Sequence, residues 1–209
     1  MATSAPTTFH RALLLCLLAL CSACSKPVPS LTRLPPDAVI LAFGDSLTFG
    51  TGVSPPESYP AVLAELTGRR VINAGLPAEL SAEGAQRLDD VLDREHPQLL
   101  ILCHGGNDLL RRLDPQQTSA HLRRMIEAAR QRGIAVVLIG VPEPKLFNRH
   151  SAPYYAILAK EFSLPLETES LARIEGDNAL KSDGVHPNAQ GYRQLAQAVY
   201  ALLQQAGAV

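Results

Sequence analysis

Three short polar motifs interrupt the apolar stretches of this chain and carry side chains suited to nucleophilic catalysis. Gly44-Asp45-Ser46-Leu47-Thr48 follows one apolar run, Gly105-Gly106-Asn107-Asp108 follows another, and Asp183-Gly184-Val185-His186-Pro187 lies near the C-terminus. A serine hydroxyl is a poor nucleophile until a neighbouring base removes its proton, and an imidazole suits that task because its pKa lies near neutral pH. We therefore predict Ser46 as a nucleophile and His186 as its base.

The third motif also supplies an acidic partner for that base. Asp183 stands three residues before His186 with Gly184 between them, so one turn could bring the two side chains together. A carboxylate in that position fixes the tautomer of the imidazole and stabilises the imidazolium that forms during proton transfer. Asp183 is therefore the expected third member of a catalytic triad.

The chain also offers hydrogen-bond donors for the negative charge that would develop on a substrate oxygen. We expect these donors to be the Ser46 N–H, the Gly75 N–H in Asn73-Ala74-Gly75 and the side-chain amide of Asn107. Loss of one such donor typically costs about 2.7–4 kcal/mol of transition-state stabilisation.

Apolar runs that alternate with helical patterns predict the elements that position these motifs. Five strands are expected, at residues 38–43, 71–73, 99–103, 134–141 and 164–166. The third and fourth are continuously apolar, as strands covered on both faces should be. Strands that alternate with helices predict an α/β fold, a three-layer sandwich in which helices flank a five-stranded parallel sheet. Ligands bind beyond the carboxyl ends of such strands, so the three motifs are expected to converge there.

Apolar side chains at helical spacing predict the helices. Asp114-Pro115 is a typical helix start, with an oxygen acceptor at the cap and proline at the first helical position. A further helix is expected over residues 154–162, and the last one follows His186-Pro187. The predicted buried faces are Tyr59, Val62, Leu63 and Leu66; Leu88, Val91 and Leu92; Leu122, Met125, Ile126 and Ala129; and Tyr192, Leu195, Val199 and Leu202.

Taken in order, Gly-Asp-Ser-Leu-Thr, Asn-x-Gly, Gly-Gly-Asn-Asp and Asp-x-x-His-Pro resemble the motifs of the SGNH (GDSL-type) hydrolases. The similarity spans residues 39–203 and is greatest to the group of periplasmic arylesterases, acyl-CoA thioesterase I and lysophospholipase L1. The resemblance implies a flavodoxin-like sheet, the quartet Ser46, Gly75, Asn107 and His186, and a triad completed by Asp183. It implies hydrolysis of carboxylic esters or thioesters through an acyl-serine, with no metal and no organic cofactor.

The second block of the motif set departs from that family's usual pattern. The relatives continue Gly-x-Ser-Gly-x-Thr, whereas this chain reads Gly75-Leu76-Pro77-Ala78-Glu79-Leu80-Ser81. Gly75 is kept, so the oxyanion role can stand, while Pro77 stiffens the loop. The departure bears on the range of substrates and not on the type of reaction.

The N-terminus resembles an export signal rather than part of the fold. Arg11 precedes a short apolar run, and Leu20-Cys21-Ser22-Ala23-Cys24 resembles the lipobox of bacterial lipoproteins. We expect residues 1–23 to be a lipoprotein-type signal peptide, Cys24 to be lipidated, residues 24–37 to form a Pro-rich tether, and 38–209 to form the hydrolase domain. The alternative is an ordinary signal peptide cleaved near Ala23, which would leave a soluble periplasmic or secreted enzyme.

Composition excludes several other classes of protein. The chain has 209 residues, a formal net charge of −1 and no basic stripe, so nucleic acid is not an expected partner. Of its four cysteines only Cys103 falls in the domain, which excludes an intrachain disulfide and a cysteine zinc site there. We expect a monomer that acts on a small-molecule or lipid ester at the periplasmic side of the bacterial envelope.

Other interpretations of these residues stay open. The enzyme could instead be a polysaccharide O-deacetylase of the cell envelope, or the chain a non-catalytic envelope lipoprotein that binds glycan or lipid. Asp45 and Asp108 are expected to accept backbone N–H bonds that hold their loops, and Cys103 to be a small buried residue. His104 either lines the site or is exposed to solvent.

Overall fold

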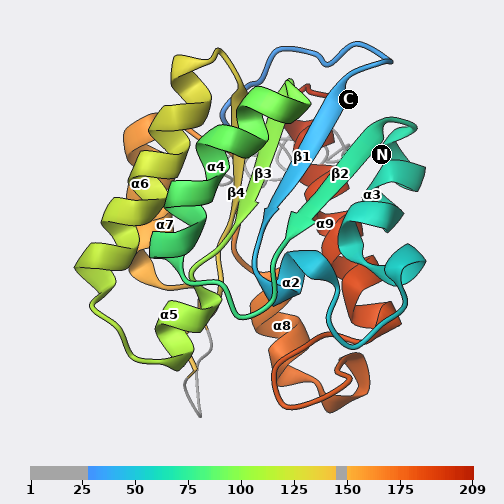
Figure 1. The fold of residues 1–209 in the computed structure, drawn as a ribbon. Helices are drawn as coiled ribbons and strands as arrows, with labels where there is room; N and C mark the ends of the chain where they lie inside the picture. Colours follow the sequence, from blue (N-terminus) through green and yellow to red (C-terminus); the bar gives the residue numbers. More distant parts are fainter. Residues whose placement is uncertain (1–27, 145–149) are drawn as a thin grey trace, which may run out of the picture.

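A five-stranded parallel sheet forms the centre of the molecule, as predicted. The computed structural model describes residues 28–144 and 150–209. The strands follow the order β2-β1-β3-β4-β5 and all run in the same direction; Figure 1 shows β2, β1, β3 and β4 side by side. Their bounds are β1 Val39–Gly44, β2 Arg70–Gly75, β3 Leu99–Cys103, β4 Ala135–Ile139 and β5 Leu166–Glu167.

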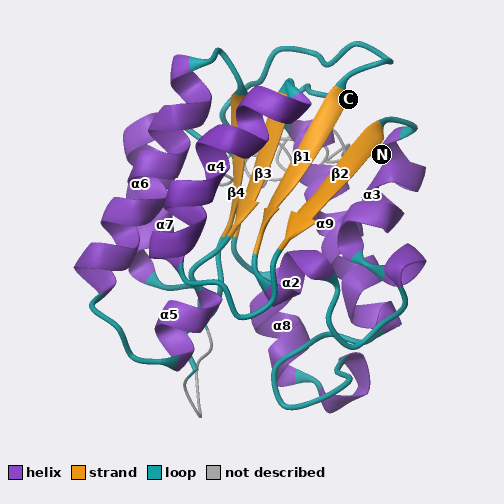
Figure 2. Cartoon of the chain, viewed as in Figure 1, coloured by secondary structure: helices purple, strands orange, loops and turns teal. Residues whose placement is uncertain are grey.

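Helices cover both faces of this sheet, and the three layers are visible in Figure 2. Helices α3 (Tyr59–Thr67) and α9 (Ala189–Gln205) pack against each other on one face. Helices α4 (Ser81–Glu95), α6 (Pro115–Gln131) and α7 (Pro153–Phe162) form the layer on the other face. Because β3 is covered on both sides, all five of its residues are buried. The α/β fold class is therefore confirmed.

The two longest helices, α6 and α9, begin where the sequence predicts. Asp114 caps α6 by accepting a hydrogen bond from the Gln116 N–H at 2.9 Å, and Pro115 occupies the first helical position. Asn188 caps α9 by accepting one from the Gly191 N–H at 3.0 Å. Such a cap satisfies an N–H that has no partner within the helix. The predicted apolar faces of α6 and α9 are buried.

Several short elements were not predicted from the sequence. They are the helices α2 (Ser46–Phe49), α5 (Gly106–Leu110) and α8 (Ser170–Gly176), and the 3-10 turns η1 (Pro55–Glu57) and η2 (Asn178–Leu180). Each is too short to show a helical period, so hydrophobic spacing cannot reveal it. Strand β5 is also shorter than expected, because Pro165 has no N–H to donate to its neighbour β4.

Residues 28–37, which belong to the Pro-rich tether expected over residues 24–37, pack against the domain. The Leu31 N–H donates to Ala206 O at 2.8 Å, and the Leu34 N–H donates to Ala208 O at 2.9 Å. The Leu34 side chain is only 6% exposed. Apolar residues among the prolines thus attach this segment to the C-terminal end of the chain. The rest of the expected tether, Cys24 and the expected signal peptide lie outside the described residues.

Within the described parts of the chain, no helix combines the length and apolar character needed to cross a bilayer.

Candidate active site

Ser46 lies at the carboxyl end of β1, as the first residue of helix α2. The preceding residue, Asp45, caps this helix by accepting a hydrogen bond from the Leu47 N–H at 3.0 Å. Gly50 closes it with a left-handed backbone conformation, φ 92°. A tight turn between the strand and the helix therefore holds Ser46 at the edge of the sheet. Asp45 holds its loop, as expected.

The structure brings the three residues of the predicted triad together. The Ser46 Oγ lies 2.9 Å from His186 Nε2, although the two residues are 140 positions apart in sequence. On the other side of the ring, His186 Nδ1 lies 2.7 Å from Asp183 Oδ2. The predicted turn is present as well, because Asp183 Oδ1 accepts hydrogen bonds from the N–H groups of Val185 and His186, both at 2.7 Å.

These contacts keep Asp183 ionised at neutral pH. The main-chain N–H of His186 is the largest influence, and with the His186 side chain and the Val185 N–H it lowers the pKa of Asp183 to about 2. Desolvation raises the pKa of Asp183, but these hydrogen bonds together outweigh it. An ionised carboxylate at Nδ1 leaves Nε2 free to accept the proton of Ser46.

Gly75 lies at the end of β2, where the backbone of helix α2 approaches it closely. A Cβ atom at this position would lie 2.1 Å from the Phe49 N, so no larger residue fits without a shift of the main chain. The Gly75 N–H donates to Asn73 Oδ1 at 3.0 Å, and Asn73 Nδ2 in turn donates to Phe49 O at 3.2 Å. The expected oxyanion donor is thus already hydrogen-bonded within the chain.

Asn107 lies in α5, at the carboxyl end of β3. Its Nδ2 donates to the main-chain oxygen of Glu79 at 3.0 Å. A side-chain amide has two N–H groups, so one further donor is left for a substrate. Asn107 and Ser46 line the same cavity, which places this donor beside the predicted nucleophile.

That cavity has a volume of about 280 Å³ and opens beside Ser46. Most of the side chains around it are apolar, which suits a hydrocarbon group better than a sugar. The lining residues are Asp45, Ser46, Leu47, Gly106, Asn107, Leu109, Leu110, Val141, Pro142, Pro144, Glu175, Gly184 and Val185.

Asp108, a further polar residue of the motifs, connects helix α5 to helix α4. Asp108 accepts hydrogen bonds from the Ser81 N–H at 2.9 Å and from the Ser81 hydroxyl at 2.6 Å, which attaches helix α5, where Asn107 also lies, to helix α4. Cys103 is fully buried as expected, and burial raises the pKa of its thiol well above the usual value. No group of three or more metal-binding side chains occurs within residues 28–144 and 150–209.

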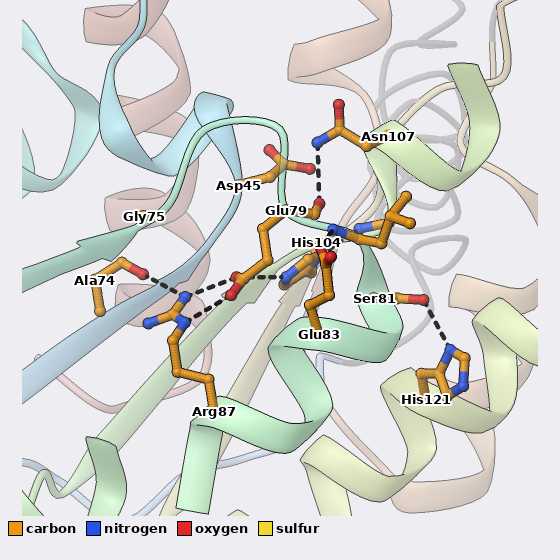
Figure 3. A network of polar contacts seen from close by, with 12 residues as sticks. Asp45, Ala74, Gly75, Glu79, Ser81, Glu83, Arg87, His104, Asn107 and His121 are labelled. Atoms are coloured by element: carbon orange, nitrogen blue, oxygen red, sulfur yellow. Dashed lines mark hydrogen bonds and ion pairs between the residues drawn. The ribbon is translucent and has the colours of Figure 1, made fainter. Parts of the chain in front are cut away.

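One cluster close to the site was missed by sequence reasoning. His104, expected to line the site or to be exposed, is instead fully buried, and its Nε2 lies 3.0 Å from Glu79 Oε2 (Figure 3). Arg87 binds both oxygens of the same carboxylate. The position of His104 directly after a continuously apolar strand was a signal of its burial. Nothing in the local sequence joins it to Glu79 or Arg87, which come from a different loop and helix.

Comparisons with known proteins agree with this geometry. Residues 42–194 match the model of the GDSL-like Lipase/Acylhydrolase family. Esterase TesA of Pseudomonas aeruginosa is 30% identical over 185 residues, which cover 83% of this chain and 91% of that protein. Thioesterase 1/protease 1/lysophospholipase L1 of Escherichia coli is 30% identical over 156 residues, which cover 71% of this chain and 75% of that protein.

Solved structures show the same relationship. The crystal structure of TesA superimposes with a TM-score of 0.71 at 27% identity, covering 79% of this chain and 98% of that one. AlinE4, an SGNH-hydrolase family esterase, superimposes with a TM-score of 0.61 at 33% identity, covering 83% of this chain and 98% of that one. On these matches the chain belongs to the GDSL-like lipase/acylhydrolase family and is a hydrolase of ester bonds.

Proposed function

We propose that the protein hydrolyses carboxylic esters or thioesters with Ser46 as nucleophile, His186 as general base and acid, and Asp183 as the orienting carboxylate. The observation that carries the proposal is the continuous hydrogen-bonded series from the Ser46 hydroxyl through the His186 ring to Asp183. The names of the relatives, an esterase and a thioesterase/lysophospholipase, support the same chemistry.

The reaction follows from these contacts. His186 Nε2 takes the proton of Ser46 as Oγ bonds to the carbonyl carbon, and Asp183 stabilises the imidazolium. The tetrahedral intermediate then collapses, the bond to the alcohol or thiol breaks, and His186 returns the proton to that leaving group. A water molecule, deprotonated by the same ring, attacks the acyl-Ser46 ester and releases the acid.

Three donors face the developing negative charge in this proposal. As the first residue of α2, Ser46 has an N–H without a partner inside the helix. The second N–H of the Asn107 amide adds to it. The Gly75 N–H completes the set when a substrate oxygen shares or displaces its bond to Asn73.

The apolar cavity beside Ser46 is the proposed acyl site. Its volume of about 280 Å³ lies just below the usual range for sites that enclose a drug-sized ligand, which is about 300–1,000 Å³. We therefore expect esters of short to medium acyl chains to be better substrates than palmitoyl esters. The apolar lining also favours an acyl group over the polysaccharide of a deacetylase.

The test is hydrolysis of p-nitrophenyl esters from acetate to palmitate by the purified protein. Ser46→Ala and His186→Ala should each abolish activity on the preferred ester, because they remove the nucleophile and the base. Ser119→Ala, on α6, and His96→Asn, just after α4, are the matched controls and should retain it. Full activity in the Ser46→Ala variant would overturn the assignment, and an optimum at palmitate would overturn the assigned acyl site.

We also propose that Cys24 is lipidated and that the enzyme acts in the periplasm from this anchor. The proposal rests on the motif Leu20-Cys21-Ser22-Ala23-Cys24. Residues 30–35 lie beside the beginnings of β3 and β4, whereas helix α2, which begins at Ser46, lies at the opposite edge (Figure 1). An anchor ahead of residue 28 would then direct the site away from its membrane. Cys24→Ala should move the protein from the membrane fraction to the soluble fraction, and an unchanged distribution would contradict the anchor.

A further inference from the structure

We propose that Glu79 and Arg87 are positioning residues that orient two donors of the oxyanion hole, the Asn107 amide and the Ala74–Gly75 peptide. This inference rests on the proposed function, since it concerns the same reaction. Figure 3 shows the contacts from which it is drawn. Arg87 lies outside the motifs that the sequence singled out, and Glu79 lies in the loop that departs from the family pattern.

The Asn107 amide is held by the main chain of Glu79. Its Nδ2 donates to the main-chain oxygen of Glu79, which lies in the loop between β2 and α4. This bond uses one N–H of the amide and so determines the direction of the other, because the amide group is planar. The orientation of the Asn107 donor therefore depends on where the Glu79 main chain is held.

The Glu79 side chain holds that main chain in place. It is only 3% exposed, and its two oxygens accept bonds from Arg87 Nε and Nη2, both at 2.7 Å, and from His104 Nε2 at 3.0 Å. Burial by itself raises the pKa of Glu79, but the bonds from Arg87 and His104 outweigh burial and lower it to about 2. A carboxylate with these partners has little freedom to move.

His104 provides a second connection between Glu79 and the segment that carries Asn107, because it lies two residues before helix α5. The Gly105 N–H donates to His104 Nδ1 at 2.9 Å, so the ring proton is assigned to Nε2, which donates to Glu79. The Tyr155 hydroxyl fixes the other side of this residue by donating to its main-chain oxygen at 2.7 Å. Glu79 is thus joined to this segment twice, through its side chain to His104 and through its main-chain oxygen to Asn107.

Arg87 connects the cluster to the second donor. Its Nη2 donates to Ala74 O at 3.1 Å, and its guanidinium lies 4.2 Å from the centre of the buried Phe43 ring. The Ala74 carbonyl and the Gly75 N–H belong to one planar trans peptide, in which they point in opposite directions. A cation on the oxygen therefore fixes the direction of the N–H and strengthens it as a donor through polarisation.

The test is steady-state kinetics of Glu79→Gln on the preferred p-nitrophenyl ester. The introduced side-chain amide would present an N–H₂ group where one of the three donors now binds, so the loop loses its fixed position. We expect kcat to fall by roughly 10- to 100-fold with KM changed by less than about threefold, since the donors act on the transition state. Arg87→Lys keeps the charge but loses the bidentate contact with the Glu79 carboxylate. It should likewise lower kcat while leaving KM nearly unchanged.

Matched controls separate this effect from the loss of any buried group. Glu167→Gln removes a buried carboxylate that binds the Ser170 N–H and hydroxyl instead. Arg69→Lys changes an arginine that binds main-chain oxygens of Leu34 and Pro35, at the far edge of the sheet. Both controls should keep kcat within about twofold of the wild type.

A double-mutant cycle with Asn107→Ala distinguishes positioning from a general structural role. Without the Asn107 amide, Glu79→Gln should lower the residual kcat by less than about threefold, because its main target is gone. An equal loss in both backgrounds, or a folded Glu79→Gln variant with kcat within twofold of the wild type, would overturn the proposal. Should Glu79→Gln fail to fold, Arg87→Lys in the otherwise wild-type chain decides, and a folded Arg87→Lys variant with kcat within twofold of the wild type would overturn the proposal. Failure of the proposed function shows differently, as wild-type activity that does not depend on Ser46.

Discussion

Acid should destabilise the wild-type protein more than it destabilises the Glu79→Gln variant. Glu79 is buried beside Arg87 and His104, and its pKa lies at about 2, compared with an ordinary value of 4.5. A group whose pKa is lower in the folded state than in the unfolded chain stabilises the fold in its ionised form. That contribution is fully present above about pH 5 and is lost as the pH falls toward 2.

The size of the effect follows from these two pKa values. At pH 7 the carboxylate is ionised in both states, so no proton is taken up on unfolding. At pH 3 the unfolded chain binds the proton and the folded protein largely does not, which lowers the free energy of unfolding by about 2 kcal/mol. Glu79→Gln cannot lose this contribution, because a glutamine does not titrate.

The assay is urea denaturation at pH 7 and at pH 3, followed by circular dichroism. The quantity compared is the drop in the free energy of unfolding between the two pH values, so that the constant cost of the substitution and the shared acidic groups cancel. We expect the drop to be smaller by about 2 kcal/mol in Glu79→Gln. Glu127→Gln removes one exposed carboxylate from α6 and should change the drop by only a few tenths of a kcal/mol. Equal drops in wild type and Glu79→Gln would refute the assigned environment of Glu79.

Substitutions of Gly84, Asp183 and Tyr155 should each have a measurable effect. Replacement of a helical glycine by alanine normally stabilises a helix by about 1 kcal/mol. A Cβ at Gly84, however, would lie 2.3 Å from the buried His104 Nε2, so Gly84→Ala should lower the free energy of unfolding by about 1–3 kcal/mol. Thermal unfolding measures this, and a raised Tm would contradict the packing. Asp183→Asn should lower kcat by about 10²–10⁴-fold at unchanged KM, because the amide no longer selects the reactive tautomer of His186. Activity near that of the wild type would remove Asp183 from the proposed triad. Tyr155→Phe should lower the free energy of unfolding by about 1–3 kcal/mol, because the buried main-chain oxygen of His104 loses its donor. Urea denaturation measures this, and an unchanged midpoint of unfolding would show that this bond contributes nothing.

Local sequence was sufficient to predict the fold class and to select Ser46, Asp183 and His186, which the structure brings together. Apolar runs reveal strands such as β3 because a strand covered on both faces excludes polar side chains along its whole length. The triad could be predicted because Asp183 and His186 share one turn and Ser46 directly follows a strand. The carboxyl ends of parallel strands meet at one edge of the sheet, so these motifs converge wherever the exact ends of the elements fall.

Tertiary structure alone decided how the proposed oxyanion donors are held. The Glu79 carboxylate meets Arg87 from α4 and His104 from the end of β3, and no spacing in the sequence marks these partners. The burial of His104 depends on the missing side chain of Gly84, a neighbour in space that lies 20 positions earlier in the chain. The packing of residues 28–37 was also decided by tertiary structure. Their prolines predict a tether, but the Leu31 and Leu34 N–H groups donate to main-chain oxygens near the C-terminus, which lies far away in the sequence. Periodicity reports which face of an element is apolar, whereas the pairing of single polar groups depends on how whole elements pack.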